Sequence, residues 1–308
     1  MILTVTANPA IDKVYFVDEF VMGNVYRPKG MSITAGGKGL NVSRVASILG
    51  ESVTAMGFIG GGAGDFIRNQ VRELGIEEDF TQINGETRTC INISDNNGLS
   101  VEILESGPTV TKEDKDTFLA QFKKNVKKCK IVCVSGSLPK GLDSSFYCQL
   151  IEICKLENKP IIVDTSGSVM ADVIEKAPSL IKPNFDELAQ LIKDAPKNDE
   201  TIKEFLGFLK EKGITVPFVT LGKNGAVALI DGKYIKFNVP KVSVKNAVGS
   251  GDSTVAGVAV GICKGLSMEK AIRLGMAVGV TNTQFKETGM VTAQLVEKYY
   301  NEITISEF

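Results

Sequence analysis

Short apolar runs alternate with amphipathic segments along most of the chain. The runs are rich in Val, Ile and other strand-forming residues, and they predict strands at 2–6, 53–59, 131–134, 160–163, 180–181 and 216–221. Apolar residues at helical spacing predict helices at 42–49, 112–128, 144–157, 199–212 and 255–263. This alternation is typical of an α/β fold with a doubly wound, mainly parallel sheet flanked by helices.

One part of the chain departs from the alternation. The stretch 12–34 is unusually long for a connection before the first convincing helix. Further on, two strand-like runs are joined by Asp95-Asn96-Asn97-Gly98, a strong hairpin signal. We therefore expect the segments 12–34 and 86–105 to form a small β-sheet beside the main one.

Composition narrows the class of protein. The formal net charge of −1 does not indicate a surface for nucleic acid or for an acidic membrane. The chain has no histidine, which excludes Ser-His-Asp and Cys-His mechanisms and most zinc sites and leaves carboxylates or lysines as the expected bases. Six cysteines without a C-x-x-C pair indicate buried thiols in a reducing compartment. With no membrane-length apolar run and no secretory signal, we expect a cytoplasmic protein.

The most informative stretch is the glycine-rich start of the helix over 255–263. Gly249, Ser250 and Gly251 precede Asp252 there. Backbone N–H groups at a helix start attract an anion, and glycines let the backbone come close to it. A carboxylate would repel that anion unless it has a chemical task, such as accepting the proton of an attacking hydroxyl. The alternative is that Asp252 only complements the helix dipole.

A second glycine-rich stretch precedes the helix at 42–49. Gly36 and Gly37 lead to Lys38, which would supply the countercharge to a bound anion, and Asn41 can cap the helix. The alternative is a flexible loop with a solvated lysine. In the same way Arg88, which opens a strand of the hairpin, would by default be a solvated edge arginine.

Asn184 and Glu187 also allow two interpretations. An Asn at a helix start followed three residues later by a Glu is a capping box, worth about 1 kcal/mol. The same two side chains, after a strand end, suit phosphate or metal binding. From these residues alone the capping interpretation is favoured.

Taken together, six motifs make the chain resemble the ribokinase-like (PfkB) family of carbohydrate kinases. In the family's order they are GGKGLN (36–41), GFIG (57–60), SGSLP (135–139), KPNFDE (182–187), VTLGKNGA (219–226) and VGSGD (248–252). Within the family the chain is most similar to the branch of 1-phosphofructokinases and tagatose-6-phosphate kinases. It departs from many relatives at Cys90, where they have Asn, and at Ala247. The resemblance implies a single ribokinase-like kinase domain over 1–308, in which 12–34 and 86–105 form a β lid.

The resemblance also implies roles for individual residues. Asp252 would be the general base, and the backbone amides from Val248 through Gly249, Ser250 and Gly251 would form an anion hole. The sugar hydroxyls would be held by Asp12, Gly37 and Asn41. The phosphate already on the substrate would be held by Arg27, Lys38, Arg88 and Ser137. ATP would be faced by Lys182, Asn184, Glu187, Thr220, Gly222 and Gly225, with Glu187 acting through Mg²⁺ and its waters.

The implied activity is ATP-dependent phosphorylation of a ketohexose monophosphate, fructose 1-phosphate or tagatose 6-phosphate, to the bisphosphate. A monovalent cation such as K⁺ near the anion hole and a homodimer formed through the β lid are further implications. One alternative is a kinase for an unphosphorylated sugar or nucleoside, but three cations would be poorly compensated by a neutral sugar. Another is a sugar-phosphate sensor, which would gain nothing from the carboxylate of Asp252 at its phosphate site.

Overall fold

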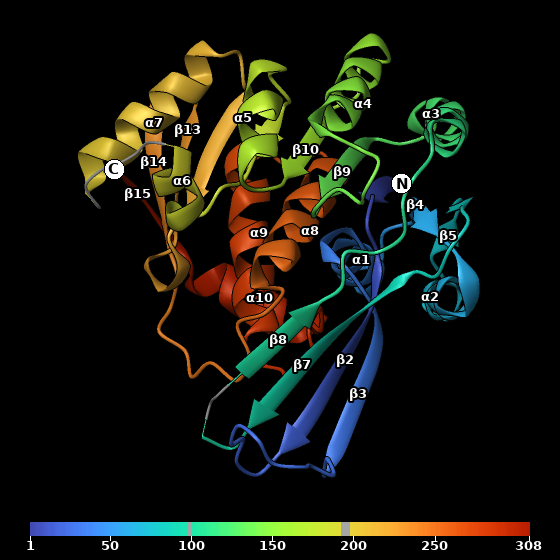
Figure 1. Ribbon diagram of the computed structural model, residues 1–308. Coiled ribbons are helices and arrows are strands. Elements are labelled where there is room, and N and C mark those ends of the chain that lie inside the picture. The colour runs from blue at the N-terminus through green and yellow to red at the C-terminus, as the bar shows by residue number, and fades with distance from the viewer. Residues whose placement is uncertain (98–99, 192–197) are drawn as a thin grey trace.

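A central sheet runs through the molecule (Figure 1). The structure is a computed structural model that describes residues 1–97, 100–191 and 198–308. In spatial order its strands are β5 (Glu77–Glu78), β4 (Val53–Ile59), β1 (Ile2–Thr6), β9 (Ile131–Ser135), β10 (Ile161–Asp164), β11 (Leu180–Ile181), β12 (Val216–Thr220), β13 (Ala226–Ile230), β14 (Lys233–Asn238) and β15 (Thr304–Glu307), with β6 (Thr81–Gln82) paired to β4. From β5 to β12 the strands are parallel, and β12 to β15 are antiparallel. The predicted mainly parallel, doubly wound sheet is confirmed.

The apolar runs become central strands because both faces of the sheet are covered. Along β9, Ile131 and Cys133 join the core on one face, whereas Val132 and Val134 join the core on the other. Successive side chains of a strand point to opposite faces, so a continuous apolar run fits a strand buried on both sides.

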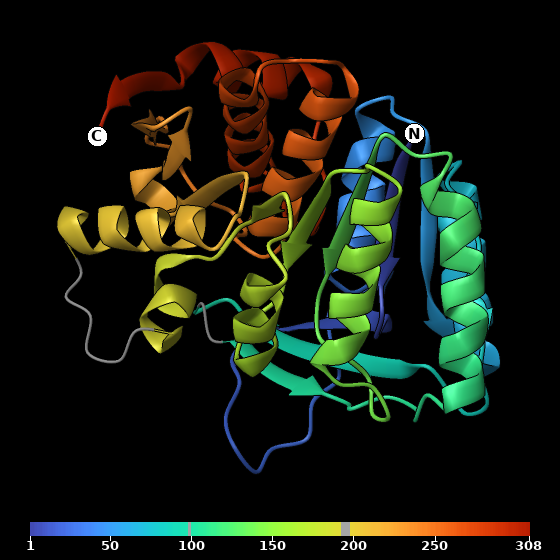
Figure 2. The ribbon, with the colours of Figure 1, turned by 90° about the horizontal axis from the view of Figure 1, so that it is seen from above.

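Two layers of helices cover the sheet (Figure 2). One layer consists of α1 (Lys38–Ile48), α8 (Ser250–Cys263), α9 (Met268–Asn282) and α10 (Ala293–Glu302). The other consists of α3 (Lys112–Val126), α4 (Ser144–Leu156), α5 (Ser168–Glu175), α6 (Phe185–Leu191) and α7 (Asp199–Glu211). α2 (Gly61–Glu73) packs on β4 and β5 and on the small sheet. No helix in these described ranges is both long and apolar enough to span a bilayer.

The small sheet is formed by β3 (Gly30–Gly36), β2 (Ala10–Val17), β7 (Arg88–Asp95) and β8 (Ser100–Leu104), in that order. Its central pair, β2 and β7, is parallel, and the two outer pairs are antiparallel. The predicted pairing between the early insert and the hairpin is therefore present. Residues 98–99, at the end of the predicted hairpin turn, lie outside the described residues.

α8 differs from the expectation of a single buried stripe, because it is buried almost all round. It lies between the sheet and α9, and its glycines let the two helices approach closely. A Cβ at Gly257 would lie 2.7 Å from Cα of Gly275, and a Cβ at Gly261 would lie 2.7 Å from Cα of Ala271. Contacts this short would force the helices apart, so α8 and α9 can pack this closely only with small residues at these positions.

Candidate active site

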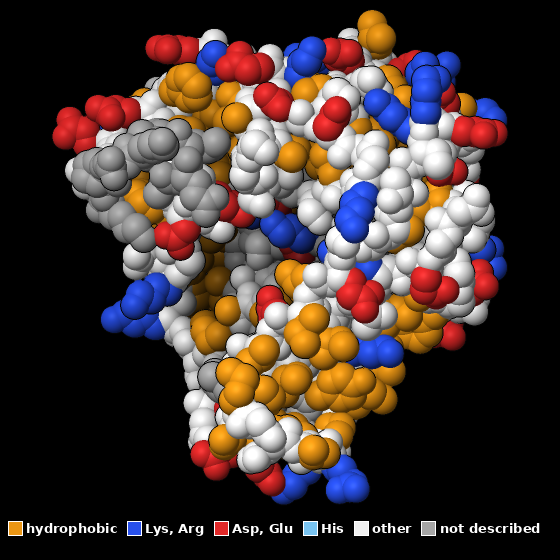
Figure 3. All heavy atoms as spheres, in the orientation of Figure 1, with side chains coloured by type: hydrophobic (Ala, Val, Ile, Leu, Met, Phe, Trp, Pro, Cys, Tyr) orange, Lys and Arg blue, Asp and Glu red, His pale blue; other side chains and the backbone are white. Residues whose placement is uncertain are grey.

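The carboxyl ends of the parallel strands bring most of the predicted residues to one edge of the main sheet. Ser137 follows β9, Lys182 and Asn184 follow β11, and Thr220 ends β12. This is the edge at which open α/β sheets bind ligands. The molecular surface is hollowed between this edge and the small sheet, with basic and acidic side chains at the border of the hollow (Figure 3).

The start of α8 has the backbone geometry of an anion site. Gly249 has a φ of 77°, in the left-handed region, and a Cβ there would lie 2.5 Å from Cγ2 of Thr288. The amide of Val248 donates to Oδ1 of Asn246 (2.9 Å), and that of Ser250 donates to the carbonyl of Ala247 (3.2 Å). The amides of Gly249 and Gly251 have no acceptor within the described ranges. These two amides are the ones that could donate to a bound anion.

Asp252 is buried, with 6% of its surface exposed. Its Oδ2 accepts a hydrogen bond from Nδ2 of Asn41 at 2.8 Å. Burial and the nearby carboxylate of Asp164 raise the pKa of Asp252 to about 6, against the opposing effects of Asn41, Lys38 and Lys182. A carboxylate of this kind is ionised at neutral pH and is a stronger proton acceptor than a solvated aspartate.

The predicted capping role of Asn41 is wrong. α1 begins at Lys38, and its N-cap is Gly37, whose φ of 105° is open to glycine but strained for other residues. Asn41 lies inside the helix, where its amide is free to contact Asp252. The helix therefore starts earlier than predicted, and the pairing of Asn41 with Asp252 replaces the cap.

Asp164, at the end of β10, was not among the predicted site residues. Its Oδ1 lies 3.8 Å from Nζ of Lys38, and its Oδ2 lies 3.4 Å from Nζ of Lys182. Asp164 and Lys182 are almost fully buried, whereas Lys38 is partly exposed. Asp164 is the leading cause of a raised pKa of Lys38, which keeps that lysine charged. The signal that could have found Asp164 is an acidic residue at the end of a buried parallel strand.

Lys182 also reaches the anion site. A Cβ at Gly251 would lie 3.3 Å from Nζ of Lys182, so the missing side chain leaves the ammonium beside the start of α8. One carboxylate thus holds two ammonium groups, Lys38 on the side of the small sheet and Lys182 on the side of β11. Lys182, beside the start of α8, is therefore the cation placed to stabilise the charge of a transferring phosphoryl group.

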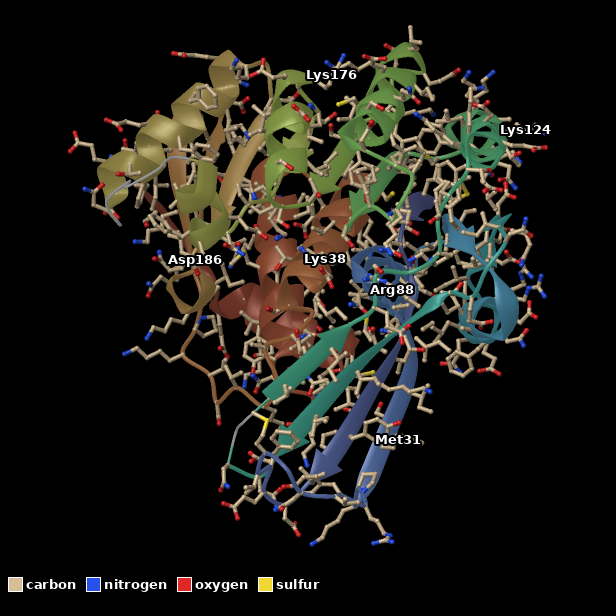
Figure 4. The ribbon with its side chains drawn as sticks, in the orientation of Figure 1. Met31, Lys38, Arg88, Lys124, Lys176 and Asp186 are labelled. Carbon is tan, nitrogen blue, oxygen red and sulfur yellow. The ribbon has the colours of Figure 1, made fainter. Side chains whose placement is uncertain are left out.

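Lys38 and Arg88 lie between the main sheet and the small sheet (Figure 4). Arg88 donates to the carbonyl of Asn8 (2.8 Å) and to the carbonyl of Glu105 (3.1 Å). Its Nε is buried without a partner among the described residues, which leaves a donor for a ligand. Ser137 is exposed next to Gly136, where a Cβ would lie 3.8 Å from Cβ of Lys38. Gly136, which precedes Ser137, therefore lies against Lys38.

Arg27 is not brought to this group. It lies in the exposed loop 18–29, and its guanidinium makes no hydrogen bond or ion pair with the part of the chain described. The loop is at the far end of the small sheet, which Met31 marks in Figure 4. The length of β3 separates this loop from Lys38, roughly 20 Å at the rise of an extended strand.

Asp12 lies on β2, against the end of β3. A Cβ at Gly36 would lie 2.0 Å from its Oδ2, so glycine is needed there. Burial raises the pKa of Asp12 to about 6, while Arg88, Arg44 and the amide of Gly37 act in the opposite direction. Asp12 is paired in register with Cys90 of β7. The amide of Gly37 is hydrogen-bonded to Asp12, so these two residues lie together, and their role in sugar binding stays a prediction.

Asn184 and Glu187 form the predicted capping box of α6. The amide of Asn184 donates to Oε2 of Glu187 (2.9 Å), and the amide of Glu187 donates to Oδ1 of Asn184 (2.8 Å). No hydrogen bond engages the second carboxylate oxygen of Glu187 within the described ranges, so capping and ligand binding are compatible.

The loop after β12 lies next to this box. The amide of Thr220 donates to the carbonyl of Pro183 at 3.1 Å. Gly225 has a φ of 85°, and a Cβ there would lie 1.8 Å from the carbonyl oxygen of Phe237. Gly222 also has a positive φ, of 56°. The loop 220–225 is thus held in a glycine-dependent turn beside Asn184.

The chain is similar in sequence and in structure to known kinases. Residues 5–293 match the family described as pfkB family carbohydrate kinase. A tagatose-6-phosphate kinase of Staphylococcus epidermidis is 39% identical, and the alignment covers 100% of both chains. The structure is similar to that of a protein from Thermotoga maritima described as a possible 1-phosphofructokinase, with 27% identity, a TM-score of 0.92, and coverage of 100% of this chain and 99% of that one. It also shares its fold with Escherichia coli phosphofructokinase-2, solved in complex with potassium, at 23% identity and a TM-score of 0.90, over 98% of both chains.

Proposed function

The chain belongs to the pfkB family of carbohydrate kinases, and we propose that it transfers a phosphoryl group from ATP to the free primary hydroxyl of a ketohexose monophosphate, giving the 1,6-bisphosphate. The observation that carries this proposal is the buried carboxylate of Asp252 beside the start of α8. It is flanked by the two ammonium groups held by Asp164. A base, an anion hole and paired cations are the parts that phosphoryl transfer needs.

Asp252 acts as the general base in this scheme. It accepts the proton of the sugar hydroxyl while that oxygen forms its bond to the γ-phosphorus of ATP. The bond between the γ-phosphorus and the bridging oxygen breaks, and ADP leaves with the electron pair. The free amides of Gly249 and Gly251, with Lys182 beside them, stabilise the negative charge on the transferring group.

The phosphate already on the sugar binds between Lys38 and Arg88. The two side chains lie on the side of the small sheet (Figure 4), and the orphan Nε of Arg88 is a donor available to that phosphate. Ser137 adds a hydroxyl next to Lys38, while Asp12 and Asn41 hold the sugar hydroxyls. Lys38 is paired with Asp164, but a neutral sugar would leave the buried Nε of Arg88 without an acceptor, which argues against an unphosphorylated substrate.

The nucleotide lies against Lys182, Asn184 and the loop 220–225. Within the described ranges no three acidic or cysteine side chains converge as a metal cage. Mg²⁺ is commonly held by one or two carboxylates together with phosphates and waters, and the free oxygen of Glu187 fits that mode. When bound, Mg²⁺ neutralises charge on the phosphates of ATP. Glu187 would hold the ion through its waters, while the backbone amide of Asn184 keeps the carboxylate in place.

Tagatose 6-phosphate is the substrate we favour, because the relative of that activity is 39% identical over the whole chain. Fructose 1-phosphate is the second candidate, supported by the structural similarity to the protein described as a possible 1-phosphofructokinase. In one case the phosphoryl group is added at O1, and in the other at O6. Both reactions need a cationic pocket at one end of the sugar and a base at the other.

A coupled ADP-release assay tests the proposal. The purified protein is given ATP, Mg²⁺ and, in turn, tagatose 6-phosphate, fructose 6-phosphate, fructose 1-phosphate and unphosphorylated sugars. We expect kcat/KM to be highest with tagatose 6-phosphate and lowest with the unphosphorylated sugars. Equal rates with sugars and with their phosphates would contradict the proposed phosphate site between Lys38 and Arg88. If no acceptor led to ADP release, the result would favour the alternative of a non-catalytic sugar-phosphate sensor.

Three further features complete the proposal. We place a monovalent cation beside the anion hole, where the irregular loop 239–249 offers backbone carbonyls of the kind that bind K⁺. Comparing kcat in K⁺ and Na⁺ salts at equal ionic strength tests this cation site.

We propose a homodimer formed by the small sheet, whose surface carries many of the exposed apolar side chains (Figure 3). Six free cysteines support a cytoplasmic location.

A further inference from the structure

Arg44 connects three parts of the chain from within α1. Its Nη2 donates to the carbonyl of Ala35 on β3 (2.5 Å). Its Nη1 donates to the carbonyl of Thr288 (3.2 Å) and to Oδ1 of Asn41 (3.0 Å). The guanidinium is partly buried and has a fixed fork geometry, so it holds all three acceptors in one arrangement.

The bond to Asn41 decides which way its amide faces. Because Oδ1 accepts from Arg44, the NH₂ group at the other side of the amide points to Asp252, where it donates at 2.8 Å. A flipped amide would place its oxygen against the carboxylate and its NH₂ against the guanidinium. Both contacts would be repulsive, so only one orientation is compatible with Arg44.

We propose that Arg44 is a positioning residue for the reaction: it fixes the orientation of the Asn41 amide, so that an N–H donor always faces the carboxylate that accepts the substrate's proton. This role rests on the proposed phosphoryl transfer with Asp252 as base. In that reaction Arg44 does not touch the reacting atoms. It acts through Asn41 and keeps Asp252 ionised and aimed at the hydroxyl.

The same guanidinium also supports the anion hole. Thr288, whose carbonyl it binds, packs its methyl group against Gly249, and Gly289 follows with a φ of 70°. A Cβ at Gly289 would lie 2.9 Å from Nη1 of Arg44. The missing side chain is what lets the loop reach the guanidinium. The base and the anion hole are thus held by one side chain.

Other charged groups also face Asp252. Asp164 approaches from β10, Lys38 from α1, and Lys182 from the segment after β11. None of them is hydrogen-bonded to Arg44. Replacing Arg44 leaves these three groups unchanged, so a change in the titration of Asp252 would report the loss of the Asn41 donor.

The experiment compares Arg44→Met, Arg44→Lys, Asn41→Ala and the double variant Arg44→Met/Asn41→Ala. The pKa of Asp252 is measured by ¹³C NMR of the carboxyl groups, assigned with Asp252→Asn, and the acidic limb of kcat is measured in parallel. The NMR titration needs no substrate. It therefore tests Arg44 even if every acceptor sugar fails, which would refute only the proposed function.

We expect Arg44→Met and Asn41→Ala each to raise the pKa of Asp252 by about one to two pH units, the value of one hydrogen bond to a charged group. Arg44→Lys should restore part of the shift, because an ammonium still donates to Oδ1 of Asn41. The double variant should shift no further than Asn41→Ala alone, since the two residues act in series. The acidic limb of kcat should also move upward, but Arg44 acts on Asp12 as well, so the NMR titration of Asp252 is the deciding measurement.

An unchanged pKa in Arg44→Met, or additive shifts in the double variant, would overturn the proposal. If the Met variant does not fold, the Lys variant decides in the same way, with a smaller upward shift as support and none as refutation. Arg68→Met is the matched control. Arg68, on α2, makes contacts with Asp65, Glu78 and Gln82, outside the site. Its loss should leave the titration of Asp252 unchanged.

Discussion

Asp252 is buried as an ionisable group, and this has opposite effects on stability and on catalysis. Because burial raises its folded pKa from 3.8 to about 6, the ionised form destabilises the fold. The carboxyl group favours the folded state below pH 4, and this contribution is lost as the pH rises through 6. At pH 7 the cost is about 3 kcal/mol, as expected for a shift of roughly two units.

Asp252→Asn should therefore separate the two effects. The amide keeps the size and can still accept from Asn41, but it cannot accept a proton at neutral pH. We expect kcat to fall by about 10²–10⁴-fold, with KM for both substrates changed only a few-fold. We also expect a higher melting temperature at pH 7, because the cost of the buried charge disappears. A folded variant with more than about a tenth of wild-type kcat would exclude Asp252 as the base.

Two carboxyl groups of the site, Asp12 and Asp252, have a pKa raised to about 6. If the active form needs both ionised, kcat/KM should fall below pH 6 with a slope approaching two in log units. Asp12→Asn should reduce that slope to one while leaving the remaining limb in place. A slope of one in the wild type would mean that only one of the two groups controls the reaction.

Lys38 gives the clearest test of the phosphate clamp. Arg88 also holds two backbone carbonyls, so its removal would disturb the fold as well. Lys38→Met should raise KM for the sugar phosphate by about 10–100-fold, as expected for the loss of one charged contact, with little change in KM for ATP. Lys123→Met, an exposed substitution on α3, is the control. An unchanged sugar-phosphate KM in Lys38→Met would place the clamp elsewhere.

At the scale of elements, the small sheet is far less buried than the central strands of the main sheet. β8 is mostly exposed and β7 is half-buried along its length, whereas β1 is fully buried. If the small sheet closes over the substrates, its amides should exchange with solvent more slowly when sugar phosphate and nucleotide are saturating. Hydrogen exchange with mass spectrometry checks this, with β1 as the internal reference. Equal exchange in both states would mean a static sheet.

The local pattern of apolar residues predicts the strands of the main sheet, but it does not predict the side-chain contacts of the site. Short apolar runs predict β1, β4 and β11 at their observed bounds, because strands that are buried on both faces leave a strong local signal. The pairing of Asn41 with Asp252 spans 211 positions, and the contact between Arg44 and Thr288 spans 244. No local pattern carries such information. The sequence around Asn41 therefore indicates only a helix cap, and nothing local to Arg44 indicates its contacts.

The antiparallel edge was missed for a related reason. β13 and β14 are joined by a short turn, but β15 comes from the last residues of the chain. Its pairing with β14 depends on the whole fold between them. The glycine motifs, in contrast, were recognised because glycine itself reports backbone geometry, as the positive φ angles of Gly37 and Gly249 show.

At the scale of the whole molecule, the exposed apolar side chains of the small sheet predict self-association. Met31, Ile103 and Leu104 are 55%, 54% and 64% exposed. We expect the wild type to sediment as a dimer and Leu104→Glu to sediment as a monomer, because a charge would be buried unpaired in the interface. Leu156→Glu is the control, since Leu156 is also exposed but lies on α4. A dimer that survives Leu104→Glu would have to use another surface.

The position of β1 has a consequence for how the chain is made. It precedes both β4 and β9 along the chain, yet in the finished sheet it lies between them. Its buried faces and one of its edges stay uncovered until β9 has been synthesised. During that interval the nascent chain presents a strand able to pair with other chains. The synthesis of the segment between β1 and β9 is therefore the stage at which this strand is most open to aggregation.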